Sequence, residues 1–470
     1  MDNKNKWVVF LLVATAVFMS TLDSSIVNVA LPYIMEDFHT KVNIIQWVIL
    51  SYLVTVSSLL LTFGRLSDIV GRKTVYTFGF LIFVTGSFFC SIATASLFLI
   101  ISRVIQGCGA AMLMACSPAI ITDLFSPKER GKALGMIGTV VAAGLTAGPV
   151  AGGFLLDFFS WRSIFYINIP IGIFAMFAGL YIFKGTDADK GNKEPLDIKG
   201  SIFLIASICS FIIALTHMDR WDTLSFRLIS LFIFSLISFV VFIKSELKSK
   251  FPLFDLSLLK IKLFILPVAS SAILFAALFI IIFLMPFYLT YPCKYSASAT
   301  GSIMITPFVF LFFLSPVSGA LYDKIGSKLL CTAGMSLLTL STVSFLFINN
   351  PPDILSIIWR LALAGIGTAL FISPNNTTAM NSVPVSKRGI ASGSVATSRN
   401  IGMVTGIALA GLLFSSTYSS LTNGASLENY TQSMNLIFMA SFKKAMAAGA
   451  VIAVPGIVLS YMRGNDKPQH

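Results

Sequence analysis

Two charged residues lie deep inside apolar stretches of the sequence, where ionisable side chains are rare. Asp23 is about 16 residues into the apolar run 7–31, which is roughly 24 Å along a helix that rises 1.5 Å per residue. Arg103 lies five or six residues into the run 98–122. If these runs cross a membrane, a charge at such depth is costly and marks a functional site by default. Burial favours the uncharged form of a carboxyl group, so we expect Asp23 to gain and lose a proton.

Arg103 has a different chemistry from Asp23. A guanidinium stays protonated in a protein, so Arg103 cannot carry the proton itself. It can hold a carboxylate ionised, or polarise a backbone carbonyl and a water molecule. Two structural alternatives compete with these roles. Asp23 forms a permanent ion pair with an arginine, or Arg103 holds neighbouring helices together through hydrogen bonds.

Further polar residues within apolar runs are candidates, together with Asp23, for a substrate cavity. Arg399 either faces the cavity, where it favours an anionic or zwitterionic group, or pairs with Asn375 or Asn376. Arg360 lies nearer the end of its run and is expected to extend its charge to the membrane surface. Three more cavity candidates lie on the second apolar run: Gln46, Trp47 and Tyr52.

The composition indicates a protein that lives in a bilayer. Of its 470 residues, 56% are hydrophobic and only 11% are charged, and the mean hydropathy is +0.87. A soluble domain carries about 25% charged residues, so this chain lacks the polar surface that water requires. Soluble enzymes, nucleic-acid-binding proteins and disordered proteins are therefore excluded. The net charge of +13 is explained by short loops that collect Lys and Arg on one side of the membrane.

Apolar runs predict an all-α polytopic membrane protein with fourteen transmembrane helices. With both termini on the inner side, 23 of the 33 Lys and Arg residues fall in inner segments, seven fall in outer segments and three lie within helices. This bias follows the positive-inside rule and places both termini in the cytoplasm. The expected spans are 7–31, 42–64, 75–96, 98–122, 133–156, 163–183, 199–217, 226–244, 262–290, 297–322, 329–348, 353–374, 390–414 and 438–462.

An internal repeat divides the chain. The segment Gly64–Lys73 recurs as Gly319–Lys328, and Arg130–Gly135 recurs as Arg388–Gly393. The repeat predicts two parallel, pseudo-symmetric six-helix bundles (1–195 and 251–470) with two inserted helices between them (196–250). Parallel halves around a site at the bilayer midplane are a transporter arrangement.

Five motifs in order resemble those of the major facilitator superfamily, and most closely its fourteen-spanner drug:proton antiporter branch of multidrug, quaternary-ammonium and tetracycline exporters. The resemblance covers nearly the whole chain and implies the major facilitator fold. The resemblance implies a role in proton coupling for Arg103, because the corresponding arginine has that role in the family. The motifs are Leu22–Pro32, Gly64–Lys73, Arg103–Ala111, Gly144–Gly153 and Trp161–Pro170.

The fourth of these motifs, the antiporter motif, predicts a tightly packed and bent helix. Gly144, Gly148 and Gly152 repeat on one face, and small residues let helices approach closely in lipid. Pro149 removes a backbone donor and loosens the helix, and Gly153 completes the motif. We expect a hinge between conformational states, and the alternative is ordinary close packing.

The Gly64–Lys73 motif suggests a latch. Asp68 can cap a neighbouring helix and pair with Arg72, while Gly64 and Gly71 complete the motif. Its counterpart in the repeat is Asp323. We expect these residues to hold the halves together on the cytoplasmic side. The alternative is a solvated loop charge.

These features predict a non-enzymatic, proton-coupled antiporter of the cytoplasmic membrane. It would export amphipathic small molecules by alternating access, as in multidrug efflux and antibiotic resistance. The proton-motive force would drive it without a cofactor, and its partners would be substrate, protons and lipid. We expect a monomer. The main alternative is an importer or translocator of an anionic lipid or organic acid, because one deep carboxylate against Arg103 and Arg399 leaves the core near +1. A non-transporting membrane sensor is a third class, which no feature favours.

Overall fold

The computed structural model describes residues 3–126, 129–182, 197–218, 225–249, 254–349, 353–384 and 387–464. Across these residues the regular structure is helical, which confirms the predicted fold class. Fourteen helices, some with a short interruption, are long and apolar enough to cross a membrane. The prediction of fourteen spans is therefore confirmed.

The spans fall into six, two and six along the chain. The first six are α1 (Asn3–Asp37), α2 with α3 (Val42–Ile45 and Trp47–Val70), α4 (Arg72–Ser91), α5 (Ser96–Leu124), α6 (Arg130–Phe158) and α7 with α8 (Ser163–Tyr166 and Asn168–Ile182). The inserted pair is α9 (Ile198–Thr216) and α10 (Phe226–Lys248). The last six are α11 (Lys262–Thr290), α12 with α13 (Ala297–Met304 and Thr306–Ile325), α14 (Ser327–Ser344), α15 (Ile354–Asn381), α16 (Arg388–Leu421) and α17 (Asn435–Tyr461).

The same helix pairs recur in the two sets of six spans, which we call the first and second halves. α1 packs along α6 as α11 packs along α16, and α4 packs on α5 as α14 packs on α15. Gly71 and Gly326 occupy equivalent places, and each ends a helix with a positive φ, of 105° and 78°. Glycine adopts this conformation without a Cβ clash. The predicted domain boundaries at 195/196 and 250/251 lie outside the described residues, so the division into domains stays a prediction.

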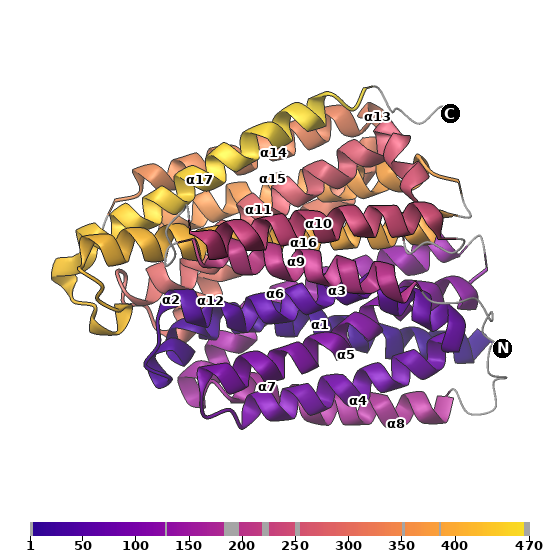
Figure 1. Ribbon diagram of the computed structural model, residues 1–470, viewed down its shortest axis with the longest axis horizontal. Helices are drawn as coiled ribbons and strands as arrows, with labels where there is room; N and C mark the ends of the chain where they lie inside the picture. The colour runs from indigo at the N-terminus through magenta and orange to yellow at the C-terminus, as the bar shows by residue number, and fades with distance from the viewer. Residues whose placement is uncertain are drawn as a thin grey trace.

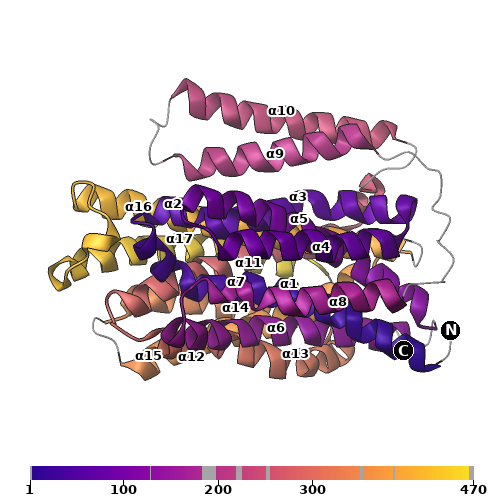
Figure 2. The same ribbon diagram turned by 90° about the horizontal axis from the view of Figure 1, so that it is seen from below.

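Both ends of the described chain lie at one end of the bundle. Figure 1 shows α1 beginning and α17 ending on the same side, as an even number of spans requires. We call this the terminal end and the opposite one the far end. Figure 2 shows the α9–α10 hairpin along one edge of the molecule, where α9 packs on both α3 and α16. The hairpin therefore touches both halves from the outside.

Several helices extend beyond the apolar runs that predicted them. α1 ends at Asp37 rather than 31, α3 at Val70 rather than 64, and α16 at Leu421 rather than 414. The hydropathy signal ends with the hydrocarbon layer, whereas a helix satisfies its backbone hydrogen bonds in any surroundings. As a result the Gly64–Lys73 motif is helical except at Gly71, which separates α3 from α4.

One face of α6 packs on α1 within the same half. A methyl group on Gly144 would overlap Thr21 Oγ1. A methyl group on Gly148 would overlap Ser25 Oγ and lie 2.9 Å from the amide nitrogen of Ile26. These glycines therefore allow close contact between α1 and α6. In lipid, such close packing drives helix association, because the hydrophobic effect does not.

A different face of α6 meets α12 in the second half. A Cβ on Gly153 would lie 2.5 Å from the carbonyl oxygen of Ala297, and one on Gly301 would overlap the carbonyl oxygen of Pro149. Gly152 belongs to the first face, because its Cβ would meet Ile26. The antiporter motif thus contacts α1 through one face and α12 of the second half through another face.

We predict that Gly148→Ala lowers the stability of the protein by about 1–3 kcal/mol, because the added methyl group overpacks the α1–α6 contact. The matched control is Gly138→Ala on the same helix, where a methyl group would meet nothing within 4 Å. That change should be neutral or stabilising by up to about 1 kcal/mol. Thermal unfolding in detergent, followed by size-exclusion chromatography, measures both. Equal midpoints for the two variants would contradict the packing described here.

Candidate functional site

Asp23 lies inside the first half, in contact with hydrogen-bond donors from two other helices. Its Oδ2 accepts from Arg103 Nη1 of α5 at 2.5 Å. Its Oδ1 accepts from Gln106 Nε2 of α5 at 2.8 Å and from Asn168 Nδ2 of α8 at 3.0 Å. The side chains of Asp23 and Arg103 are both 0% exposed. The carboxylate is therefore held by three donors away from any solvent.

A second set of contacts fixes the donors. Arg103 Nε donates to the carbonyl oxygen of Val48 at 3.0 Å, and its guanidinium lies over the Tyr52 ring at 4.2 Å. Gln106 Oε1 accepts from Arg103 Nη1 at 2.5 Å, and Gln106 Nε2 also donates to Ser87 Oγ at 2.8 Å. The network thus ties together α1, α3, α4, α5 and α8.

The local sequence explains why these groups meet. Arg103 and Gln106 are three residues apart, so they share one face of α5. Glycines bring α4 against that helix: a Cβ on Gly86 would overlap the Gln106 backbone, and one on Gly109 would overlap that of Phe83. Close backbone contact places Ser87 beside the amide of Gln106.

The network unites the two residues with which the sequence analysis began. The permanent-ion-pair alternative for Asp23 and the structural alternative for Arg103 both describe contacts that the structure contains. Gln106, Asn168 and Ser87 were not predicted as site residues. Gln106 and Asn168 nevertheless lie in two of the recognised motifs, and an amide side chain within an apolar span is the signal that would have found them.

This geometry can respond to a proton. A proton on Asp23 Oδ2 would occupy the position at which Arg103 Nη1 donates, so the two groups could not keep their present contact. Arg103 would remain tied to the Val48 carbonyl through Nε. Because surroundings without water screen charges weakly, neutralising Asp23 would strongly change the attraction between α1 and α5.

The three cavity candidates of the second span have different surroundings. Tyr52 lies in the Asp23 network beneath Arg103. Gln46 contacts the second half, since a Cβ on Gly411 of α16 would overlap its Oε1. Trp47 is partly buried and packs against the apolar core. Tyr52 thus belongs to the buried network and Gln46 to the contact between halves.

Arg399 lies on α16 without the predicted amide partner. Its guanidinium is 5.9 Å from the centre of the Phe275 ring, and its Nε has no hydrogen-bond partner among the described residues. Asn375 Nδ2 instead donates to the carbonyl oxygen of Pro267 at 3.3 Å, and Asn376 is partly buried. Of the two alternatives for Arg399, pairing with Asn375 or Asn376 is therefore wrong.

The expectation for Arg360 is also wrong. Its side chain does not extend to a membrane surface, because the residue is only 7% exposed. Arg360 Nε donates to the carbonyl oxygen of Ser344 at 2.9 Å, Nη1 donates to that of Ser356 at 2.6 Å, and the guanidinium lies over the Trp359 ring. Backbone carbonyls supply the acceptors that water would otherwise provide.

The predicted latch residues form a cluster at the terminal end. Arg72 donates to Asp68 Oδ1 at 3.1 Å, forms an ion pair with Asp123, and donates to the carbonyl oxygen of Ala119 at 3.2 Å. These partners belong to α3 and α5 of the first half, so these bonds stabilise one half rather than joining two. Asp323, the counterpart of Asp68, is exposed on α13.

Hydrogen bonds between the halves are found instead at the far end. Asp157, at the end of α6, accepts hydrogen bonds from the first backbone amides of α12: Oδ1 from Ala297 N at 3.1 Å and Oδ2 from Ser298 N at 3.0 Å. Free amides at a helix N-terminus favour a negative charge. A helix of the second half is thus capped by a carboxylate of the first.

Other polar contacts cross between the halves at the far end, and two of them join pairs of side chains. Tyr291 donates to Glu36 Oε1 at 3.0 Å, and His39 Nδ1 lies 2.5 Å from Glu428 Oε1. Burial, aided by the nearby Glu36 carboxylate, raises the pKa of the Tyr291 hydroxyl well above its usual value. Tyr291 therefore stays protonated and remains a donor at any physiological pH.

Comparison with known proteins identifies the family. The model of the Major Facilitator Superfamily matches residues 13–407. The chain belongs to this superfamily of membrane transporters. The fold agrees: a bacterial homologue of the human lysosomal transporter Spinster, solved in an inward-facing and occupied conformation, is similar with a TM-score of 0.69 at 16% identity, over 100% of both chains.

Two relatives of the transporter are similar over most of its length. It is 35% identical to the riboflavin transporter RibZ of Clostridioides difficile, over 99% of both chains. It is 30% identical to the multidrug resistance protein Stp of Mycobacterium tuberculosis, over 87% of this chain and 76% of that one.

We predict that removing either charge of the buried pair destabilises the transporter more than removing both. Asp23→Asn leaves Arg103 without a counter-charge, and Arg103→Gln leaves the carboxylate alone, at a cost of about 3–5 kcal/mol each. The double variant restores neutrality and should unfold at a temperature between those of the parent and of either single variant. A double-mutant cycle on thermal midpoints measures the coupling. Strictly additive effects would show that the two charges do not interact.

We also predict that Asp157→Ala opens the far end. Loss of a capping carboxylate costs about 1 kcal/mol, which is about a fivefold shift in population. Asp157→Asn is the matched control, because its side-chain oxygen still accepts from an amide. Nitroxide labels at Phe159 and Leu436, in a background without the six native cysteines, report the separation of the halves. Identical distance distributions in the alanine variant and the parent would rule out this role for the cap.

Proposed function

We propose that this transporter is a proton-coupled antiporter that exports amphipathic small molecules across the cytoplasmic membrane, with both termini in the cytoplasm. The observation that carries the proposal is the fully buried Asp23–Arg103 pair, an ionisable carboxylate held away from water in a membrane-spanning bundle. The excess of Lys and Arg in the segments on the side of the termini supports the orientation.

A chain of contacts can transmit a change at Asp23 to the second half. Ser25 and Ile26 follow Asp23 on α1 and pack on Gly148 of α6. Pro149, the next residue of α6, packs on Gly301 of α12. Movement of α1 on protonation would therefore reach the contact between halves through α6.

The proposed cycle uses this linkage for alternating access. Protonation of Asp23 from outside would release the substrate outward, and deprotonation toward the cytoplasm would allow rebinding. One charge crossing 100 mV is worth about 2.3 kcal/mol, and one pH unit about 1.4 kcal/mol. These free energies could sustain a substrate gradient of roughly one to three decades per proton.

Riboflavin is a second candidate substrate, favoured by the riboflavin transporter RibZ, to which this chain is similar from end to end. The similarity to Stp favours broader efflux of amphipathic compounds. Arg399 is relevant to both candidates. It is a partly buried residue whose guanidinium Nε has no hydrogen-bond partner among the described residues, and such a group favours a substrate that carries an acceptor-rich or anionic group. Both candidates retain the same proton-coupled mechanism.

Transport by proteoliposomes tests the proposal. We expect an imposed pH gradient to drive accumulation of riboflavin or of the dye ethidium in vesicles that contain the parent protein. The double variant Asp23→Asn/Arg103→Gln should lose driven accumulation yet still exchange labelled for unlabelled substrate, because its halves can still move. The amount of folded protein in each preparation is the control. Undiminished pH-driven accumulation by the double variant would disprove coupling at Asp23, and transport of only one of the two compounds would decide the substrate.

A further inference from the structure

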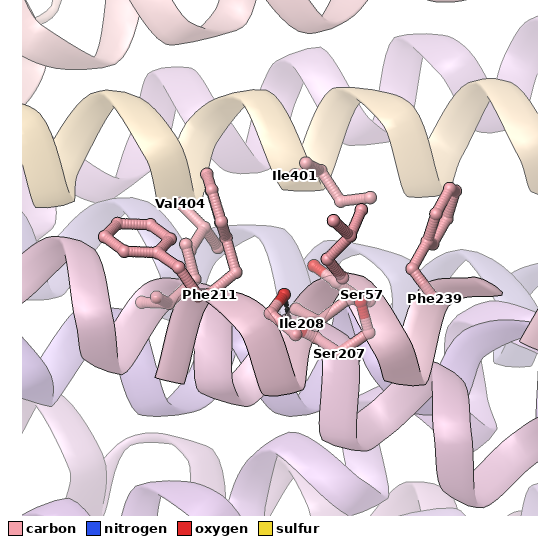
Figure 3. Close-up of a pocket in the computed structure, with 11 residues that line it drawn as sticks. Ser57, Ser207, Ile208, Phe211, Phe239, Ile401 and Val404 are labelled. Atoms are coloured by element: carbon pink, nitrogen blue, oxygen red, sulfur yellow. Dashed lines mark hydrogen bonds between the residues drawn. The ribbon is translucent and has the colours of Figure 1, made fainter. Parts of the chain in front are cut away.

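A cavity of about 390 Å³ lies where the inserted hairpin meets the two halves. Its walls come from α3 of the first half, α16 of the second half, and both hairpin helices. Figure 3 shows Ile401 and Val404 of α16 facing Ser207 and Phe211 of the hairpin across this space. The cavity shares no residue with the Asp23 network, so it is a separate feature of the molecule.

The lining is apolar and carries no charge. Its polar groups are three serines, two of which are satisfied by backbone carbonyls: Ser57 Oγ donates to Leu53 at 2.6 Å, and Ser235 Oγ donates to Ser207 at 2.9 Å. The remaining surface is aliphatic or aromatic. An occupant therefore needs no hydrogen-bonding group and is itself apolar.

The cavity opens toward the lipid. Phe211, Leu236 and Phe239 line it and are 38%, 64% and 47% exposed, on spans that lie at the edge of the molecule in Figure 2. An engineered apolar cavity of about 150 Å³ already binds benzene, so a space more than twice as large gains substantial contact energy when filled. The hydrocarbon of the bilayer is the material that surrounds its mouth.

We propose that this cavity binds one hydrocarbon chain of a membrane lipid, between the inserted hairpin and both halves. The hairpin then has a role: it supplies one wall of a lipid site that the twelve other spans could not form alone. The proposal requires no particular substrate and no proton coupling. It is therefore independent of the proposed function.

The position of the site links lipid to conformation. Ser57 belongs to the first half, and Ile401 and Val404 belong to the second. When the halves move relative to each other, the walls of the cavity move too, so a bound chain has a different affinity for each state. A ligand shifts a conformational equilibrium by that difference in affinity.

Photolabelling tests the site. The full transporter is placed in vesicles of phosphatidylethanolamine and phosphatidylglycerol, with a trace of lipid that carries a diazirine near the end of one acyl chain. We expect labels on the wall residues of α9, α10 and α16, located by mass spectrometry. Ser235→Phe fills the cavity from the hairpin and Val404→Phe fills it from α16. Each should reduce wall labelling by about tenfold.

Ile237→Phe is the matched control, because Ile237 is an exposed residue of α10 outside the cavity. It should leave labelling of the walls unchanged. Two filling variants from opposite walls keep the test decisive if one of them fails to fold. Labelling spread evenly over the exposed faces of α9 and α10, or unaffected by the filling variant that folds, would overturn the proposal. Displacement of the label by riboflavin or ethidium would also overturn it, by showing that the cavity takes substrate instead of lipid.

Discussion

A charge inside hydrocarbon needs a counter-charge and hydrogen-bond partners within a few ångströms, and this requirement organises the first half of the transporter. Asp23 meets it with three donors, and Arg103 meets it with the carboxylate, a carbonyl and an aromatic face. Four helices, α1, α3, α5 and α8, must come together to supply these groups. The pair therefore constrains where those helices can lie.

The second half repeats this architecture without the acid. Arg360 lies on α15 where Arg103 lies on α5, and both are buried. Backbone carbonyls accept the hydrogen bonds of Arg360, and α11, the counterpart of α1, contains no acidic residue. α11 therefore offers no carboxylate to the buried arginine of the second half. Glycine packing is repeated as well: a Cβ on Gly402 or Gly406 would overlap α11, as one on Gly144 would overlap α1.

The contacts between the two halves lie close to the helix that carries Asp23. At the far end, Asp157 caps α12, and small residues bring α6 against the same helix. α6 packs on α1 through its other face, and α1 itself contacts α11, so the helix that carries Asp23 takes part in the contact between halves. The Asp68–Arg72 cluster at the terminal end stabilises the first half in this conformation. Its role in joining the halves stays a prediction.

Much of this could be predicted from the sequence, since hydropathy counts spans and a lone acid in an apolar run stands out. Hydropathy predicted the fourteen spans, recurring motifs predicted the repeat, and Asp23 and Arg103 stood out as charges within apolar runs. The partners could not be predicted. Arg399 does not pair with Asn375, and Arg360 donates to backbone carbonyls. Both outcomes depend on the rotation and depth of the helices, which hydropathy does not encode. Uncharged amides such as Gln106 and Asn168 barely alter hydropathy, so their place around Asp23 required three-dimensional contacts.

The most direct test of the central claim is to measure proton release when substrate binds. In weakly buffered detergent solution, a pH-sensitive dye reports protons released on adding riboflavin or ethidium, whichever the purified parent protein binds. The account predicts release by the parent and none by the Asp23→Asn/Arg103→Gln variant, although that variant still binds the compound. Equal proton release by both proteins would show that the coupling group lies elsewhere and that the buried pair serves only to hold the helices together.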